Sequence, residues 1–127
     1  MKALVIDDSR VMRRIVAATL EDLGFECHHA ADGQEAIDIL EQDPDFDLAC
    51  IDWNMPVMNG LEFVVAVRKR RDWRGLTMMM VTTEAQHDQI VRALAAGAHE
   101  YLIKPFTPDA LKDKLELLGL VAVKELA

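Results

Sequence analysis

The chain has little of what marks secreted, membrane or nucleic-acid-binding proteins. Only two of its 127 residues are cysteines, Cys27 and Cys50, and their spacing fits neither a disulfide framework nor a metal site. No apolar run approaches the length of a membrane span, and the first residues lack the basic and apolar regions of a signal peptide. Fourteen basic residues stand against 22 acidic ones, for a net charge of −8. We therefore expect a cytoplasmic protein with free thiols, no membrane contact and no direct nucleic-acid partner.

The densest run of basic residues, from Arg68 to Arg71, ends a segment with helical apolar spacing. Cations at the end of a helix complement its dipole and remain solvated. We interpret this run as a solvated helix end, because one short cluster on an acidic chain is weak support for nucleic-acid binding.

Short apolar strands alternate five times with segments of helical spacing, without linkers between them. We expect the strands at residues 3–7, 26–30, 48–52, 77–82 and 100–103. The fifth helix is expected to begin after Thr107, its N-cap, with Pro108 at the first helical position. Gly24 and Gly97 follow two helices where a left-handed residue is favoured. Five such units predict a three-layer, doubly wound α/β fold around a parallel sheet.

Residues suited to chemistry stand at the ends of four of these strands. They are Asp7 and Asp8 after the first, Asp52 at the third, Thr82 and Thr83 at the fourth, and Lys104 after the fifth. Because parallel strands open onto one crevice at their carboxyl ends, we expect these side chains to converge there. Alone, Asp7 and Asp8 would be read as a polar helix cap. Together with Asp52 and Lys104 they predict an acidic site.

Three carboxylates in a partly desolvated cleft repel one another, so such a cluster requires a neutralising charge. An oxygen-only ligand set suits Mg²⁺. The cation leaves Asp52 able to act as a nucleophile toward phosphorus, while Lys104 and the Thr82 hydroxyl are placed to meet phosphoryl oxygens. We also expect that replacing Asp7 or Asp8 with a neutral residue raises stability in metal-free buffer.

The chain resembles the receiver domain of two-component response regulators, most closely the stand-alone, CheY-like chemotaxis type. The resemblance covers nearly the whole chain and rests on Asp7-Asp8-Ser9, Asp52-Trp53-Asn54-Met55-Pro56, Gly60, Val81-Thr82, Gly97-Ala98, Tyr101 and Lys104-Pro105-Phe106. It implies a flavodoxin-like fold with strand order 2-1-3-4-5, and a cis peptide bond before the proline that follows the lysine.

The resemblance implies a role for each matching site residue. Asp52 would accept a phosphoryl group from a phosphohistidine of a sensor histidine kinase, and Lys104 would pair with the phosphoryl oxygens. Asp8, Asp52 and the backbone carbonyl of Asn54 would hold Mg²⁺, with Asp7 acting through water.

The same resemblance implies a conformational switch. Thr82 would move toward the phosphoryl group on Asp52, and Tyr101 would turn inward into the space vacated. This two-state shift would alter the surface formed by the fourth helix, fifth strand and fifth helix, to which an output protein binds.

Three residues near the site bear on how fast the phosphoryl group is gained and lost. The family's tuning positions, two after the nucleophile and two after the switch threonine, hold Asn54 and Glu84. Thr83 departs from the family, which usually has alanine or glycine there. We expect this β-branched residue to crowd the phosphoryl site.

We therefore expect one receiver domain over residues 1–127 with no output domain, acting as a monomer or a weak phosphorylation-dependent dimer in chemotaxis or motility. It would not be a conventional enzyme, since its only catalysis would be self-phosphorylation and autodephosphorylation. A phosphorelay intermediate and a cell-cycle regulator remain open alternatives. An aspartyl-nucleophile phosphatase and an FMN carrier are less favoured, because the first strand ends in Asp-Asp, not in Asp-x-Asp or a phosphate-binding loop.

Two further segments carry expectations about packing. The run Met78–Met80 lies in the fourth strand and is expected in the core, where methionine fills irregular gaps. Near the C-terminus, one helical stripe is expected to contact either the sheet or a partner; its members are Leu117, Leu120, Val121 and Lys124.

Overall fold

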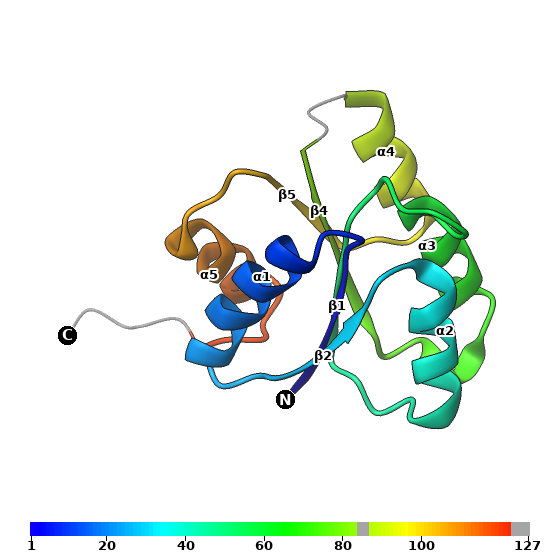
Figure 1. Cartoon of the computed structure of the whole chain (residues 1–127), viewed down its shortest axis with the longest axis horizontal. Helices are drawn as coiled ribbons and strands as arrows, with labels where there is room; N and C mark the ends of the chain where they lie inside the picture. The colour runs from blue at the N-terminus through cyan, green and yellow to red at the C-terminus, as the bar shows by residue number, and fades with distance from the viewer. Residues whose placement is uncertain (84–86, 123–127) are drawn as a thin grey trace.

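The computed structural model describes residues 1–83 and 87–122, in which strands and helices alternate (Figure 1). The elements in chain order are β1 (Lys2–Ile6), α1 (Arg10–Asp22), β2 (Glu26–Ala30), α2 (Gly33–Gln42), β3 (Leu48–Ile51), α3 (Gly60–Arg68), η1 (Arg71–Trp73), β4 (Thr77–Thr82), α4 (His87–Ala96), β5 (Glu100–Ile103) and α5 (Pro108–Leu117). Within these ranges, no helix has the length and apolar character needed to cross a bilayer.

The five strands form one sheet in the order β2-β1-β3-β4-β5, and every neighbouring pair is parallel. The expected doubly wound fold and strand order are therefore confirmed. Two strands end one residue before their expected ends, at Ile6 and Ile51. Asp7 and Asp52 still donate backbone N–H groups to Ala30 O at 3.1 Å and Ile6 O at 2.9 Å, but the ladder stops there.

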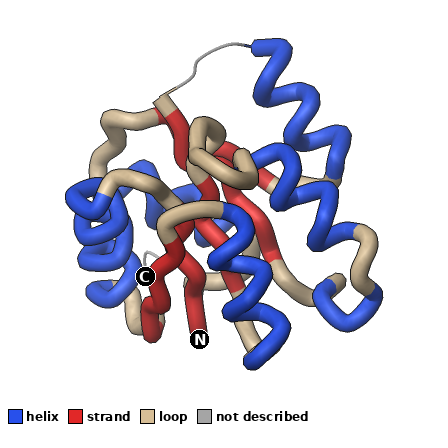
Figure 2. Tube along the Cα trace, turned by 45° about the vertical axis from the view of Figure 1, so that its right-hand side comes forward, coloured by secondary structure: helices blue, strands red, loops and turns tan. Residues whose placement is uncertain are grey.

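Helices cover both faces of the sheet. α1 and α5 lie on one side, and α2, α3 and α4 lie on the other, with the strands between them (Figures 1 and 2). Successive residues of β4 point to opposite faces. Met78 and Met80 accordingly pack with Phe63 in the core beneath α2–α4, and Met79 packs with Leu20 in the core beneath α1 and α5. The core position expected for the three methionines is confirmed.

Local signals at the helix ends act as expected. The Thr107 hydroxyl accepts a hydrogen bond from Ala110 N, and Pro108 opens α5. Gly24 and Gly97 adopt φ angles of 96° and 126°, in the region that glycine enters without a Cβ clash.

Both cysteines are free thiols, as expected. Cys50 is buried in β3 and Cys27 is half-buried in β2. Desolvation raises the pKa of both thiols, that of Cys27 to about 11, so neither carries much thiolate at neutral pH.

The interpretation of residues 68–71 as wholly solvated was wrong for Arg68. Its side chain is half-buried and donates from Nε to Gly97 O at 3.1 Å and from Nη2 to Leu76 O at 3.3 Å. A Cβ on Gly97 would lie 2.5 Å from Arg68 Cγ, so the arginine packs directly across the glycine. Arg68 therefore ties the end of α3 to the loop before β5.

The expected helical stripe near the C-terminus was also wrong, because α5 ends at Leu117. Gly119, at φ 74°, reverses the chain, and Leu120 N bonds back to Leu115 O at 3.0 Å. This turn packs Leu120 and Val121 against the core beneath α1 and α5, whereas Leu117 is 76% exposed. The remaining member of the stripe, Lys124, lies outside the described residues.

Candidate functional site

Within the part of the chain that the structure describes, four polar or charged side chains are buried, and all belong to one site. They are Asp7, Asp52, Thr82 and Lys104, which are 4%, 8%, 3% and 9% exposed. Each stands at or just beyond the carboxyl end of its strand. Burying charge is unfavourable unless it is paired, so their convergence calls for a functional reason.

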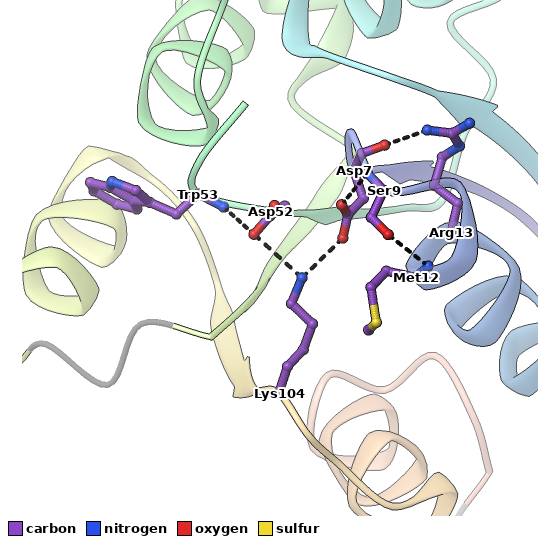
Figure 3. Close-up of polar contacts among 7 residues, drawn as sticks. All are labelled: Asp7, Ser9, Met12, Arg13, Asp52, Trp53 and Lys104. Atoms are coloured by element: carbon purple, nitrogen blue, oxygen red, sulfur yellow. Dashed lines mark hydrogen bonds and ion pairs between the residues drawn. The ribbon is translucent and has the colours of Figure 1, made fainter. Parts of the chain in front are cut away.

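Backbone and side-chain contacts fix Asp7 in the crevice (Figure 3). Its Oδ1 accepts from Ser9 N at 2.8 Å, and its Oδ2 accepts from Lys104 Nζ at 3.0 Å. Arg13 Nη1 donates to the Asp7 backbone carbonyl at 2.6 Å. Ser9 also caps α1, since its hydroxyl accepts from Met12 N at 3.2 Å. The start of α1 therefore sets the direction of the carboxylate.

Asp52 stands directly after β3, on the other side of Lys104. Its Oδ1 accepts from Trp53 N at 2.9 Å and lies 3.5 Å from Lys104 Nζ (Figure 3). Burial raises the pKa of Asp52 above that of an exposed aspartate; the Lys104 ammonium opposes this rise and the Asp7 carboxylate adds to it. Asp52 is thus a buried carboxyl whose ionised form needs positive charge nearby.

The loop after Asp52 returns tightly across the site before α3 begins. Gly60 N donates to Trp53 O at 2.9 Å, and a Cβ on Gly60 would lie only 2.4 Å from the Asp52 carbonyl oxygen. A glycine is required here because no side chain fits between the helix start and the backbone of Asp52.

Lys104 enters the site from the end of β5. Its backbone N–H donates to Thr82 O at 2.8 Å, which continues the pairing of β5 with β4 by one residue. The bond between Lys104 and Pro105 is cis, as the resemblance implied. The single ammonium lies between two buried carboxylates and offsets one negative charge of the acidic group.

The acidic group fits a hard cation. Oxygens of Asp7, Asp8 and Asp52 all lie within 4.8 Å of one another, and Asp8 is exposed to solvent. Three carboxylates against one ammonium leave a net charge of −2, and Mg²⁺ prefers oxygen ligands and retains several waters. Asn54, whose carbonyl the resemblance assigns as a further ligand, follows in the exposed part of the same loop. The donor set therefore suits Mg²⁺.

Thr82 and Tyr101 lie on one face of the sheet. In the register of β4 with β5, Met80 is paired with Tyr101 and Thr82 with Ile103. Residues two apart on a strand point the same way, so Thr82 and Tyr101 are diagonal neighbours on the face covered by α2–α4. Tyr101 is half-buried against the core there, with Lys114 Nζ 4.7 Å from its ring centroid.

Thr83 directly follows the end of β4 and is exposed to solvent. It borders a hollow of about 380 Å³ whose other walls are Met12, Ile15, Lys104, Pro105 and Phe106. The second tuning position, Glu84, lies outside the described residues.

Sequence reasoning missed two contributors to this geometry. Arg13 donates a hydrogen bond to the backbone carbonyl of Asp7, and no pattern of residue spacing predicts such a contact. Ser9 belongs to the Asp7-Asp8-Ser9 motif, but its backbone contact with the Asp7 carboxylate and its side-chain contact with Met12 N of α1 were not predicted. A serine directly before a helical segment is a recognisable N-cap signal and would have located the second contact.

Comparison with known proteins agrees with this geometry. The family described as "Response regulator receiver domain" matches residues 3–116. "Chemotaxis protein CheY homolog" of Campylobacter jejuni is 47% identical over 117 residues, which are 91% of this chain and 90% of that protein. "Chemotaxis protein CheY1" of Helicobacter pylori is 44% identical over 119 residues, covering 93% of this chain and 96% of that protein.

A solved structure gives the same result for the fold. The structure of the chemotaxis response regulator CheY4 of Vibrio cholerae matches with a TM-score of 0.84 and 41% identity, and the match covers 92% of this chain and 97% of that one. The resemblance drawn from the strand-end residues is confirmed. The chain belongs to the response regulator receiver domain family.

Proposed function

We propose that this protein is a phosphorylation-controlled signalling switch of the chemotaxis type, with Asp52 as the phosphoacceptor. The observation that carries the proposal is the burial of Asp7, Asp52 and Lys104 together at the carboxyl edge of the sheet, beside the exposed Asp8. Similarity to chemotaxis proteins over most of the chain supports the type of pathway. Family membership favours this reading over a phosphatase or an FMN carrier.

The chemistry is phosphoryl transfer from a phosphohistidine of a sensor histidine kinase. The P–N bond to the histidine breaks as a P–O bond to a carboxylate oxygen of Asp52 forms, and the imidazole released takes up a proton from solvent. Lys104 Nζ, already 3.5 Å from Asp52 Oδ1, pairs with the phosphoryl oxygens. Asp8, Asp52 and the Asn54 carbonyl would hold Mg²⁺, with Asp7 acting through water; the ion supplies charge that offsets the crowded oxygens.

The readout is a shift between two states of the face formed by α4, β5 and α5. A phosphoryl group on Asp52 draws the Thr82 hydroxyl toward it, and Tyr101, its diagonal neighbour, turns inward. An output protein binds the altered face. Asn54, Glu84 and Thr83 tune the lifetime and rate of phosphorylation.

The remaining parts of the proposal concern organisation. The chain acts as a receiver domain in the cytoplasm, where its two free thiols are stable. It is a switch and not a conventional enzyme, and it works as a monomer or a weak phosphorylation-dependent dimer.

The test is phosphorylation by acetyl phosphate followed by intact mass. The parent chain is expected to gain one phosphoryl group with Mg²⁺ and none with EDTA. Asp52→Asn should gain none, whereas Asp38→Asn, which removes an exposed carboxylate on α2, should behave like the parent. Equal labelling of Asp52→Asn and the parent would show that another residue is the acceptor.

A further inference from the structure

Four basic side chains line one small hollow on the opposite side of α1 from Thr83. Arg10, Arg13 and Arg14 of α1 and His29 of β2 surround a space of about 290 Å³. Ligand pockets start at about 300 Å³, so this hollow is the size of a compact group and not of a drug-sized molecule. On a chain of net charge −8, it collects three arginines and a histidine at one point.

The arrangement follows directly from the fold. Positions 10, 13 and 14 are three and four residues apart, so they share one stripe of α1. His29 is paired with Val5, whose side chain packs in the core beneath α1 and α5, so His29 points to the same side of the sheet as α1. Edge strand β2 and helix α1 therefore form the two walls of the hollow.

Stability does not account for this cluster. Like charges three and four residues apart on a helix are destabilising. In the part of the chain that the structure describes, Arg10 and Arg14 are exposed and form no ion pair. The half-buried Arg13 also forms no ion pair, and its one side-chain hydrogen bond goes to the backbone carbonyl of Asp7 (Figure 3). This hydrogen bond uses one of the five N–H donors of Arg13 and leaves four. It also holds the guanidinium group in place at the wall of the hollow. The cluster is thus unneutralised positive charge with one member already anchored.

We propose that this hollow binds a diphosphate group, either as free pyrophosphate or as part of a nucleoside diphosphate. Planar guanidinium groups pair with phosphate oxygens in two parallel hydrogen bonds, and three of them match the charge of a diphosphate. An acidic protein surface fits less well, since stable interfaces need about 800 Å² on each partner and the rest of this acidic chain would repel it. None of Asp7, Asp8, Asp52 and Lys104 lines the hollow, although Arg13 bonds to the Asp7 carbonyl, so the proposal does not rest on phosphorylation of Asp52.

Calorimetric titration of the full chain tests the proposal. It uses EDTA, so that no metal links the anion to Asp7, Asp8 and Asp52, and about 0.15 M salt, which screens diffuse attraction. The probes are inorganic pyrophosphate, ADP and citrate. The test variant is Arg10→Gln with Arg14→Gln, which leaves Arg13 on the Asp7 carbonyl. The matched control, Arg71→Gln with Arg74→Gln, removes the same charge from exposed residues elsewhere.

Pyrophosphate is expected to bind the parent and the control with a stoichiometry of one, and the test variant at least about tenfold more weakly, since two charge-assisted contacts are lost. Stronger binding of ADP than of pyrophosphate would identify the nucleoside diphosphate as the source; the reverse order would identify the free anion. The proposal is overturned by absence of saturable binding, by equal weakening in test and control variants, or by citrate binding as tightly as pyrophosphate.

Discussion

Replacing Lys104 with methionine removes the one buried positive charge of the site while keeping a side chain of similar length. The ammonium lies 3.0 Å from Asp7 Oδ2 and 3.5 Å from Asp52 Oδ1, and its side chain is 7% exposed. At an effective dielectric constant of about 20, each contact contributes about 5 kcal/mol of gross attraction. Much of that is offset by the cost of desolvating the lysine, so we expect the free energy of unfolding to fall by about 3–5 kcal/mol in EDTA at pH 7.5.

Metal and pH should both diminish this loss. Lys104→Met leaves a site of charge −3 in place of −2, so Mg²⁺ should bind and stabilise the variant more than the parent. Burial raises the pKa of Asp52, so its ionisation costs stability, and this cost grows as the pH rises from the ordinary aspartate pKa to the raised one. Removing the ammonium raises this pKa further. The deficit should therefore be largest at pH 7.5 and shrink as the pH falls toward 5.

Urea denaturation, followed by the fluorescence of the buried Trp53 and Trp73, measures the effect. The control is Lys114→Met, because Lys114 also pairs with a carboxylate at 3.0 Å, that of Glu100, but in a partly exposed setting. Lys114→Met should lower the free energy of unfolding by at most about 1 kcal/mol, and Mg²⁺ should not change this effect. Two results would refute the charge-balance reasoning. One is that Lys104→Met lowers the free energy of unfolding no more than Lys114→Met does. The other is that its effect changes with neither Mg²⁺ nor pH.

Three further predictions concern neighbouring features. Asp8→Asn should abolish most of the rise in melting temperature that Mg²⁺ gives the parent. In EDTA, Asp8→Asn should be more stable than Asp7→Asn, because Asp7→Asn removes the nearer carboxylate partner of the buried Lys104. Gly60→Ala should lower the free energy of unfolding by about 1–3 kcal/mol, measured by urea denaturation. Gly75→Ala should lower it little, because no neighbouring heavy atom lies within 4 Å of the new Cβ. Partial desolvation lowers the pKa of His99, which lies at the surface and whose Nδ1 accepts from Met78 N in β4 at 3.0 Å. The stability advantage of the parent over His99→Phe should therefore be full above pH 6.5 and decline as the pH falls below that value.

Much of the fold could be predicted because its signals are local. Alternating apolar strands and helical periods, the Thr107-Pro108 start of α5 and the left-handed Gly24 and Gly97 each depend on a few adjacent residues. The misjudged segments depend on tertiary contacts. Arg68 was expected in solvent because its spacing places it at a helix end. Its guanidinium instead donates a hydrogen bond to the carbonyl of Gly97, 29 residues away in the chain. Gly119 ended the expected stripe by reversing the chain, a signal that was present but outweighed by apolar spacing.

The candidate site was accessible to sequence reasoning for a different reason. In a parallel sheet the carboxyl ends of the strands share an edge. Acids, a threonine and a lysine at four strand ends must therefore meet there, whatever the packing of their side chains. Close backbone approaches lack such a rule. One example is the close approach of Gly60 to the Asp52 carbonyl. Another is Val57, a β-branched residue with a φ of 68°, a value that such residues rarely adopt. Both follow from the path of the loop between β3 and α3.

The three carboxylates also differ in a way that residue types could not reveal. Sequence reasoning treated Asp7 and Asp8 alike, as equal sources of repulsion. In the structure Asp7 is held by Ser9 N and Lys104 Nζ, so it belongs to a compensated buried pair, whereas Asp8 is exposed. The surplus negative charge therefore falls on the exposed Asp8 and on the buried Asp52 beside it. A hydrated cation held by these two carboxylates would leave the Lys104–Asp7 pair in place, so metal and ammonium would act on Asp52 together.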